Sequence, residues 1–501
     1  MTRPLRFAHE FLGRLKSQPP NRNAHDLPSY DFLDTSDRDL VVTSSWPECF
    51  HLGTGASIFT ECLIPAITTA QHEVILVTCF WARSKTLTAL CDALVKLAAH
   101  RRALIRDALV RDGATPPPLR VRICFSSRSL LQKLLHTQSR SGYVYPPVSW
   151  PRKLGLPDAS LLEAGGIELH VKSLFFLPFS VMHPKFVIID RQRAFVPSCN
   201  VSWEPWLEGC VELVGDAVRS LLAFYSRTWD QTTDCRQSFD QGAVEGVSFD
   251  PRRADLALVS SAAHHRASLG GTALPTFVLP SSHHRNPRFR PFPWQRPPAP
   301  PGTPLNIALL QLFEQAERSI YIQTPNLTCE PVIAALLDAL AEGVDVAIVT
   351  NRNMMIIEQL ATSGTTTSWS IWSLIRRFRR LKDRHRDVET GRRHPCGRLQ
   401  ISYFGPRSRA SPRGHEGRPL ITTPSRGEEP VHSHLKLTLV DDEYAVLGSG
   451  NLDRASWFTS QELGILFHGG EFCAAVKAGV DAVLEGRLAP VFDSGEDQRR
   501  G

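Results

Sequence analysis

The order of apolar and polar positions along the chain predicts helices and strands in alternation, and it does so twice. The segment IPAITTAQHEVILVTCFW, 64–81, has the pattern of a helix, a short turn and a buried strand, and LLQLFEQAERSIYIQTPNL, 309–327, repeats that pattern. Apolar residues at helical spacing follow in each half, over 87–100 and 332–343, and predict an amphipathic helix. The two halves therefore begin alike.

Each half continues with a series of predicted strands. They are expected at 119–127 and 167–176 in the first half, and at 344–352 and 399–404 in the second. Because strands alternate with helices, the fold class is expected to be α/β, with a mixed sheet flanked by helices in each half.

The segment between the halves has a different composition. Residues 272–304 are dense in Pro and Arg, which is typical of an extended linker. We therefore expect a first lobe over 40–250, a linker over 251–304 and a second lobe over 305–492.

The second half also carries an insertion over 365–398. Its early part places apolar residues three apart with arginines between them: Trp369, Trp372, Ile375 and Phe378. Three interpretations stay open. The insertion is an amphipathic helix on an anionic membrane, a helix that packs its Trp face on its own lobe, or an arginine-rich surface for a nucleic-acid backbone.

Later in each half stands the same polar motif. HPKFVIIDRQRAFVPSCN begins at 183, HLKLTLVDDEYAVLGSGN begins at 434, and both carry His, Lys, Asp, Ser and Asn at the same offsets. The first copy supplies His183, Lys185, Asp190, Ser198 and Asn200, and the second supplies His434, Lys436, Asp441, Ser449 and Asn451. Residues two apart on a strand share a face, so each His and Lys are expected to point the same way.

Two such copies facing each other would suit phosphoryl transfer. One His would attack phosphorus as a nucleophile, and the other would protonate the leaving oxygen and then deprotonate the incoming alcohol or water. The two lysines and the two asparagines would bind the non-bridging oxygens, where charge develops. The lysines already provide positive charge, so no metal or other cofactor is expected.

A neutral His acts as a nucleophile only when its other ring nitrogen is held in place. We expect an acidic residue about a dozen positions past each Asn to hold the imidazole of the opposite copy. The candidates are Glu212 and Glu462. The Asp of each motif is expected to help place its strand.

The pattern His-x-Lys-x4-Asp-x6-Gly-Ser-x-Asn resembles that of the phospholipase D superfamily, and the second copy with its following LDRASWFTSQE is most similar to cardiolipin synthases and related phosphatidyltransferases. This resemblance implies two pseudo-symmetric phospholipase D-like lobes with one active site between them and a phosphohistidine intermediate. It also implies a phospholipid substrate. One departure is Pro197, which stands where the second copy keeps Gly448, and it is expected to reshape the loop before Ser198.

Length, charge and cysteine content limit the domain number, the kind of partner and the compartment that we expect. The 501 residues suit two domains or one large pseudo-symmetric unit, and the net charge of +7 suits anionic partners such as a membrane surface. The 11 cysteines form no Cys-x-x-Cys pair, which is typical of free thiols in a reducing compartment. The pairs His264–His265 and His283–His284 lack metal-ligand spacing, so no metal site is expected there.

No apolar run reaches the length of a membrane span, so the protein is expected to be intracellular, either cytoplasmic or peripheral to a membrane. The Arg-rich start MTRPLRFAHEFLGRLKSQ leaves a mitochondrial presequence as an alternative. Both motifs lie in one chain, so a monomer is expected to suffice for activity, and the oligomeric state stays open.

Two other functions compete with a phospholipid enzyme. A nuclease or other nucleic-acid phosphodiesterase would use the same chemistry. Tyrosyl-DNA phosphodiesterases fit poorly, because their motifs lack the Asp found here at 190 and 441. A membrane-binding scaffold that kept the fold would need no catalysis at all.

Overall fold

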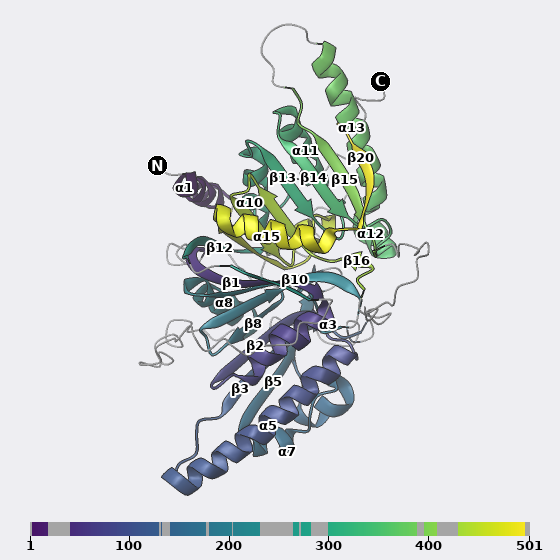
Figure 1. The fold of residues 1–501 in the computed structure, drawn as a ribbon. Coiled ribbons are helices and arrows are strands. Elements are labelled where there is room, and N and C mark those ends of the chain that lie inside the picture. Colours follow the sequence, from purple (N-terminus) through teal and green to yellow (C-terminus); the bar gives the residue numbers. More distant parts are fainter. Residues whose placement is uncertain are drawn as a thin grey trace, which may run out of the picture.

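The computed structural model describes residues 3–18, 41–129, 132, 141–176, 180–202, 204–230, 264–269, 272–281, 299–387, 395–407 and 429–495. The chain forms two α/β lobes that meet along a central boundary (Figure 1). His283, His284 and most of the predicted linker lie outside the described residues.

The first lobe is built on a mixed sheet. Its strands follow one another in the order β11 (His265–Ser268), β1 (Val42–Thr54), β10 (Trp206–Val214), β9 (Arg193–Pro197), β8 (Phe186–Ile189), β2 (Glu73–Phe80), β3 (Leu119–Ser127), β5 (Ile167–Ser173) and β4 (Tyr143–Val144). The pairs β2–β3 and β3–β5 are parallel, and the others are antiparallel. A separate hairpin is formed by β6 (Phe175–Phe176) and β7 (Ser180–Val181).

The sheet of the second lobe repeats this order. It runs β12 (Leu274–Ser281), β19 (Glu462–His468), β18 (Tyr444–Gly448), β17 (Leu437–Val440), β13 (Ser319–Gln323), β14 (Asp345–Thr350), β15 (Leu399–Phe404) and β20 (Leu488–Asp493). Again the pairs at two successive positions, β13–β14 and β14–β15, are parallel. The expectation of two pseudo-symmetric α/β lobes is therefore confirmed.

Helices flank the sheets as the apolar spacing predicts. The first lobe has α3 (Gly55–Ile58), α4 (Ile64–Thr68), α5 (Lys85–Asp112), α7 (Ala159–Ala164) and α8 (Asp216–Tyr225), with short π and 3-10 turns at Phe59–Leu63, Pro147–Ser149, Trp150–Leu154 and Ser226–Asp230. The second has α10 (Pro304–Glu314), α11 (Glu330–Ala341), α12 (Ile356–Ser363), α13 (Thr367–Asp387), α14 (Arg454–Phe458) and α15 (Gly470–Leu484). Helix α5 begins at the Ser84 cap, whose hydroxyl accepts from the N–H of Leu87, and ends at Gly113 in the left-handed region.

Two segments differ from the sequence-based prediction. Part of the predicted linker is strand β12, which pairs with β19 of the second lobe and with β1 of the first, so it joins the two sheets. Before the first lobe, helix α1 (Arg3–Lys16) packs on the second lobe, where Phe7 and Phe11 are buried and Phe7 stacks edge-on against Phe277. Both segments bury apolar side chains that the sequence pattern did not assign to a lobe.

Reciprocal strand pairing joins the lobes at the site. Strand β16 (His432–Ser433) of the second lobe runs parallel to β10 of the first, and Met182 of the first lobe forms a parallel bridge with Gln461 of the second. The backbone N–H of His183 donates to the carbonyl of Gln461 at 2.9 Å, and that of His434 donates to the carbonyl of Leu207 at 2.7 Å. Each motif histidine is thus held by the opposite lobe.

Candidate active site

The histidines and lysines of the motifs lie just before strands β8 and β17, not within them. Each lysine side chain turns back on its own histidine: Lys185 Nζ donates to the carbonyl of His183 at 2.8 Å, and Lys436 Nζ donates to that of His434 at 2.6 Å. Both ammonium groups are almost fully buried. The site therefore contains two buried cations, one from each lobe.

Each imidazole contacts a carboxylate from the other lobe. His183 Nδ1 lies 2.8 Å from Glu462 Oε2, and His434 Nδ1 lies 2.7 Å from Glu208 Oε1. Because Nδ1–H donates to the carboxylate, the lone pair of Nε2 is left for chemistry. The pseudo-symmetry that relates the two lobes also relates the two histidine–glutamate pairs. Together the pairs form one site to which both lobes contribute.

Glu208, and not Glu212, holds His434. The backbone N–H of Ser198 bonds to Gly209, as that of Ser449 bonds to Leu463, so Glu208 is the counterpart of Glu462. In the second lobe α14 lengthens the connection between Asn and Glu, so counting a dozen residues from the Asn overshoots in the first lobe. Aligning the two segments on strands β10 and β19 would have identified Glu208.

The serines orient the glutamates. Ser449 Oγ donates to Glu462 Oε2 at 2.5 Å and accepts from the N–H of Leu463 at 3.0 Å. Ser198 makes the same pair of contacts, with Glu208 and with the N–H of Gly209. The expectation that Pro197 reshapes this loop is wrong, because Pro197 stays in strand β9 and the hydroxyl of the next residue keeps its place.

The asparagines occupy corresponding positions with different partners. Asn200 Oδ1 accepts from the N–H of Phe80 at 3.2 Å, whereas Asn451 Nδ2 donates to Asp453 Oδ2 at 3.0 Å. Among the described residues, Asn451 Oδ1 is buried without a hydrogen-bond partner. Asp453 also accepts from the N–H of Ser456 and so caps α14, a role that sequence reasoning missed although Asp is a common helix cap.

Burial sets the charge states of the two pairs. It lowers the pKa of His434 to about 4, and the nearby Glu208 offsets this only in part. Burial also lowers the pKa of His183. Burial alone would raise the pKa values of Glu208 and Glu462, but the facing imidazole and the lysines outweigh it, so both pKa values fall. The free protein therefore holds neutral imidazoles against ionised carboxylates.

Burial lowers the pKa of Lys436 to about 7, so this cation titrates near neutral pH. Because an ammonium is charged only below its pKa, anion affinity is expected to fall about tenfold between roughly pH 6 and pH 8. The measurement is competitive inhibition by sulfate, whose own charge is constant over this range.

Lys436→Arg should flatten that pH dependence because guanidinium stays charged, and Lys477→Arg on α15 should leave it intact. A sulfate affinity that is independent of pH in the wild type would contradict this electrostatic description of the site.

The aspartates of the motifs lie at the far ends of the strands from the histidines. Asp190 accepts from the backbone N–H groups of residues 71–73, and Asp441 accepts from those of residues 317–319. Both adopt the left-handed region, with φ of 51° and 55°. The structure thus gives them the strand-placing role that the sequence suggested, and it does not support their inclusion among the residues that contact substrate.

Asp441→Ala is expected to destabilise the protein by about 3 kcal/mol, because three backbone N–H groups lose the fully buried carboxylate that accepts from them. Asp442→Ala is the matched control, since Asp442 is exposed and has nearly the same φ, 56°. Thermal unfolding of the two variants measures the difference. Equal melting temperatures for the two variants would show that the loss of stability comes from backbone strain at positive φ and not from the lost hydrogen bonds.

Residues 309–483 match the family described as "Cardiolipin synthase, PLD-like domain". The second lobe, which contains these residues, therefore resembles a phospholipase D-like domain. No match was found among curated protein sequences.

One of the similar solved structures supports the fold of the whole chain. Phosphatidylserine synthase from Haemophilus influenzae Rd KW20 is similar with a TM-score of 0.52 and 14% identity, over 90% of this chain and 89% of that one. A phospholipase D family member, Nuc, from Salmonella typhimurium has 13% identity and a TM-score of 0.25, over 43% of this chain and 97% of that one. NucT from Helicobacter pylori has 15% identity and a TM-score of 0.22, over 37% and 89%.

Proposed function

We propose that the protein is a phospholipase D-type phosphodiesterase or phosphatidyltransferase that acts on phospholipid through a phosphohistidine intermediate. The observation that carries the proposal is the pair of imidazoles, each held through Nδ1 by a buried glutamate of the opposite lobe. Two imidazoles with free Nε2 atoms beside two buried ammonium groups supply a nucleophile, an acid–base and charge stabilisation in one site.

In the first step, Nε2 of His183 attacks phosphorus and the bond from phosphorus to the headgroup oxygen breaks. His434 donates a proton to that oxygen, so the headgroup leaves as a neutral alcohol. His183 is named as nucleophile because its side chain is 16% exposed, whereas that of His434 is 5% exposed. The anionic phosphate of the bound substrate raises the pKa of the facing imidazole, which lets His434 carry the proton.

In the second step, His434 takes a proton from water or from a second alcohol. The new oxygen attacks phosphorus, the bond between phosphorus and His183 breaks, and the neutral imidazole is restored. Lys185 and Lys436 face the charge that develops on the non-bridging oxygens, with Asn200 and Asn451 beside them. A second phospholipid alcohol as acceptor would give a cardiolipin synthase-like reaction.

The membrane interpretation of the 365–398 insertion is supported by its exposed aromatic residues. Helix α13 packs on its lobe through Ile371, Leu374 and Phe378, while Trp369 is 64% exposed and Trp372 is 50% exposed. The interpretation that this face packs on its own lobe therefore holds for Ile375 and Phe378 but not for the two tryptophans. Arg376 lies over the Trp372 ring at 5.0 Å, so apolar and basic groups share one surface.

Helix α12 extends this surface toward the site. We define the α12–α13 patch as Met355, Ile356, Ile357, Leu360, Trp369 and Trp372, all exposed. Helix α12 lies near β16 at the boundary of the lobes (Figure 1), and the Thr362 carbonyl accepts from Arg454 at 3.1 Å. Arg454 follows Asn451 by a few residues, so a membrane in contact with the patch would lie beside the site. No described helix is long and apolar enough to cross a membrane.

Replacing Trp369 and Trp372 together by Ser is expected to weaken binding to anionic vesicles about tenfold or more, because two interfacial indoles are lost. The measurement is vesicle sedimentation. Trp46→Ala, which removes a partly exposed indole from β1, is the control and should bind as the wild type does. Unchanged binding by the double variant would remove the patch from the membrane interface.

The experiment that tests the proposed function is turnover of vesicles with mixed, headgroup-labelled phospholipids by wild type and His183→Ala. Headgroup release by the wild type alone is the expected result. Cleavage of single-stranded DNA or of a generic phosphodiester, with no release from any phospholipid, would favour a nucleic-acid phosphodiesterase. Vesicle binding without turnover of either substrate would favour a scaffold.

A further inference from the structure

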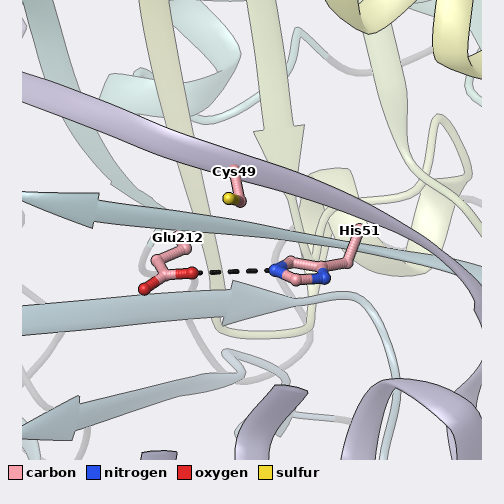
Figure 2. Close-up of side chains that lie close together, drawn as sticks. All are labelled: Cys49, His51 and Glu212. Carbon is pink, nitrogen blue, oxygen red and sulfur yellow. Dashed lines mark ion pairs between the residues drawn. The ribbon is translucent and has the colours of Figure 1, made fainter. Parts of the chain in front are cut away.

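A second polar cluster lies on the first lobe, apart from the histidine–glutamate pairs. Cys49 and His51 are two apart on β1 and share a face, and Glu212 on β10 lies directly opposite Cys49. One ligand atom from each lies within 4.8 Å of the others, and all three residues are buried (Figure 2). We propose that Cys49, His51 and Glu212 bind a divalent cation of the zinc class, which goes beyond the proposed reaction.

The geometry fits a metal better than it fits a hydrogen bond. His51 Nε2 lies 3.7 Å from Glu212 Oε2, and among the described residues it has no hydrogen-bond partner although His51 is only 5% exposed. This separation is too long for a hydrogen bond. Two ligand atoms at about 2.1 Å from a tetrahedral zinc ion are roughly 3.5 Å apart, so a small closure would bring both into coordination.

The surroundings of His51 leave the Nε2 lone pair directed at the carboxylate. His51 Nδ1 lies 3.1 Å from His264 Nε2, and His264 Nδ1 lies 3.5 Å from Ser57 Oγ. When His264 donates from Nδ1 to the serine, its Nε2 accepts from His51 Nδ1–H. His51 Nε2 then faces a carboxylate oxygen, and either a proton or a metal ion would lie between them. A ligating histidine usually has its other ring nitrogen held in this way.

The neighbouring cations contact the outer sides of the ligands. Arg193 Nε lies 3.2 Å from Glu212 Oε1, which leaves Oε2 facing His51, and Arg266 Nε lies 3.2 Å from Cys49 Sγ. A thiolate and a carboxylate together offset the charge of a divalent ion. One sulfur, one imidazole and one carboxylate oxygen are a donor set that suits zinc, with a water as the fourth ligand.

A bound ion would hold strand β10 in place, and β10 carries Glu208, the carboxylate that contacts His434. Glu208 and Glu212 project from the same face of β10, and Glu208 holds His434. A cation that ties β10 to β1 would therefore stiffen the strand on which Glu208 is presented to the other lobe. We assign the ion a structural role that sets the position of the histidine–glutamate pair.

The test is titration of the full-length, chelator-treated protein with Co²⁺, followed by optical absorption and thermal unfolding. The expected result is uptake of one ion per chain, a cobalt–thiolate absorption band and a raised melting temperature. Cys49→Ser should lose the band, and Glu212→Gln, which keeps the side-chain shape, should weaken uptake at least tenfold. Cys473→Ser, a buried cysteine of α15, should keep both properties.

Circular dichroism shows whether each variant is folded before the titration. If folded wild-type protein takes up neither Co²⁺ nor Zn²⁺, then a proton alone lies between His51 and Glu212 and the proposal is overturned. Equal uptake by wild type and by a folded Glu212→Gln variant would overturn it as well. Because these readouts do not use turnover, they are independent of the phospholipid assay.

Discussion

His183→Ala is expected to lose all measurable turnover, and His434→Ala to lose about 1,000-fold or more, because each supplies a group that no neighbour replaces. Their separate roles can be resolved with a p-nitrophenyl phosphodiester. Its leaving group is a good one and departs without a general acid, so only the nucleophile is needed for the first step.

With that substrate, His434→Ala should release about one equivalent of p-nitrophenol per chain and then stop, because the intermediate lacks a base to activate water. The protein should then carry phosphorus bound to His183. His183→Ala should give no burst. The opposite pattern, a burst only in His183→Ala, would exchange the two roles. A full rate in both variants would refute histidine catalysis.

Glu208→Gln is expected to lower kcat about 100-fold or more with little change in KM, since the carboxylate that stabilises imidazolium at His434 is lost. Gln still accepts a hydrogen bond from Nδ1, so the variant removes charge more than shape. Losing the negative charge lowers the pKa of His434 further, so the acidic limb of the pH profile should move to lower pH.

Glu462→Gln should behave in the same way through His183, and Glu208→Asp should recover part of the activity by restoring the charge. Glu163→Gln on α7 is the control and should keep wild-type kinetics. A Glu208→Gln variant with normal kcat and an unshifted profile would mean that the carboxylate only packs beneath the imidazole.

The sequence predicted the repeated elements well because each has a strong periodic pattern. The strands expected at 119–127 and 399–404 coincide with β3 and β15. Strand β12 was not predicted because Pro275 and Pro280 lie within it. Proline is rare inside strands, so a segment that contains two prolines was interpreted as a linker. Helix α5 extends to Asp112, past its predicted end at 100, since charged residues continue the helix where apolar spacing fades.

At the site, the sequence predicted the residues that recur in both copies of the motif. Glu208 was missed because its distance from Asn200 differs from that in the second copy, and only strand register reveals the match. The Cys49, His51 and Glu212 cluster has no counterpart motif at all. Its members are brought together by the pairing of β1 with β10, two strands far apart in sequence. Linear spacing therefore could not predict it.

The proposed mechanism requires an enzyme-bound phosphatidyl group that can be transferred either to water or to an alcohol. The most direct test is the product distribution from phospholipid vesicles as a primary alcohol is added. We expect phosphatidyl-alcohol to replace phosphatidic acid while the rate of headgroup release stays constant, and we expect His183→Ala to form neither product. Release of headgroup with phosphatidic acid as the sole product at every alcohol concentration, and no phosphorus trapped on the protein, would contradict it.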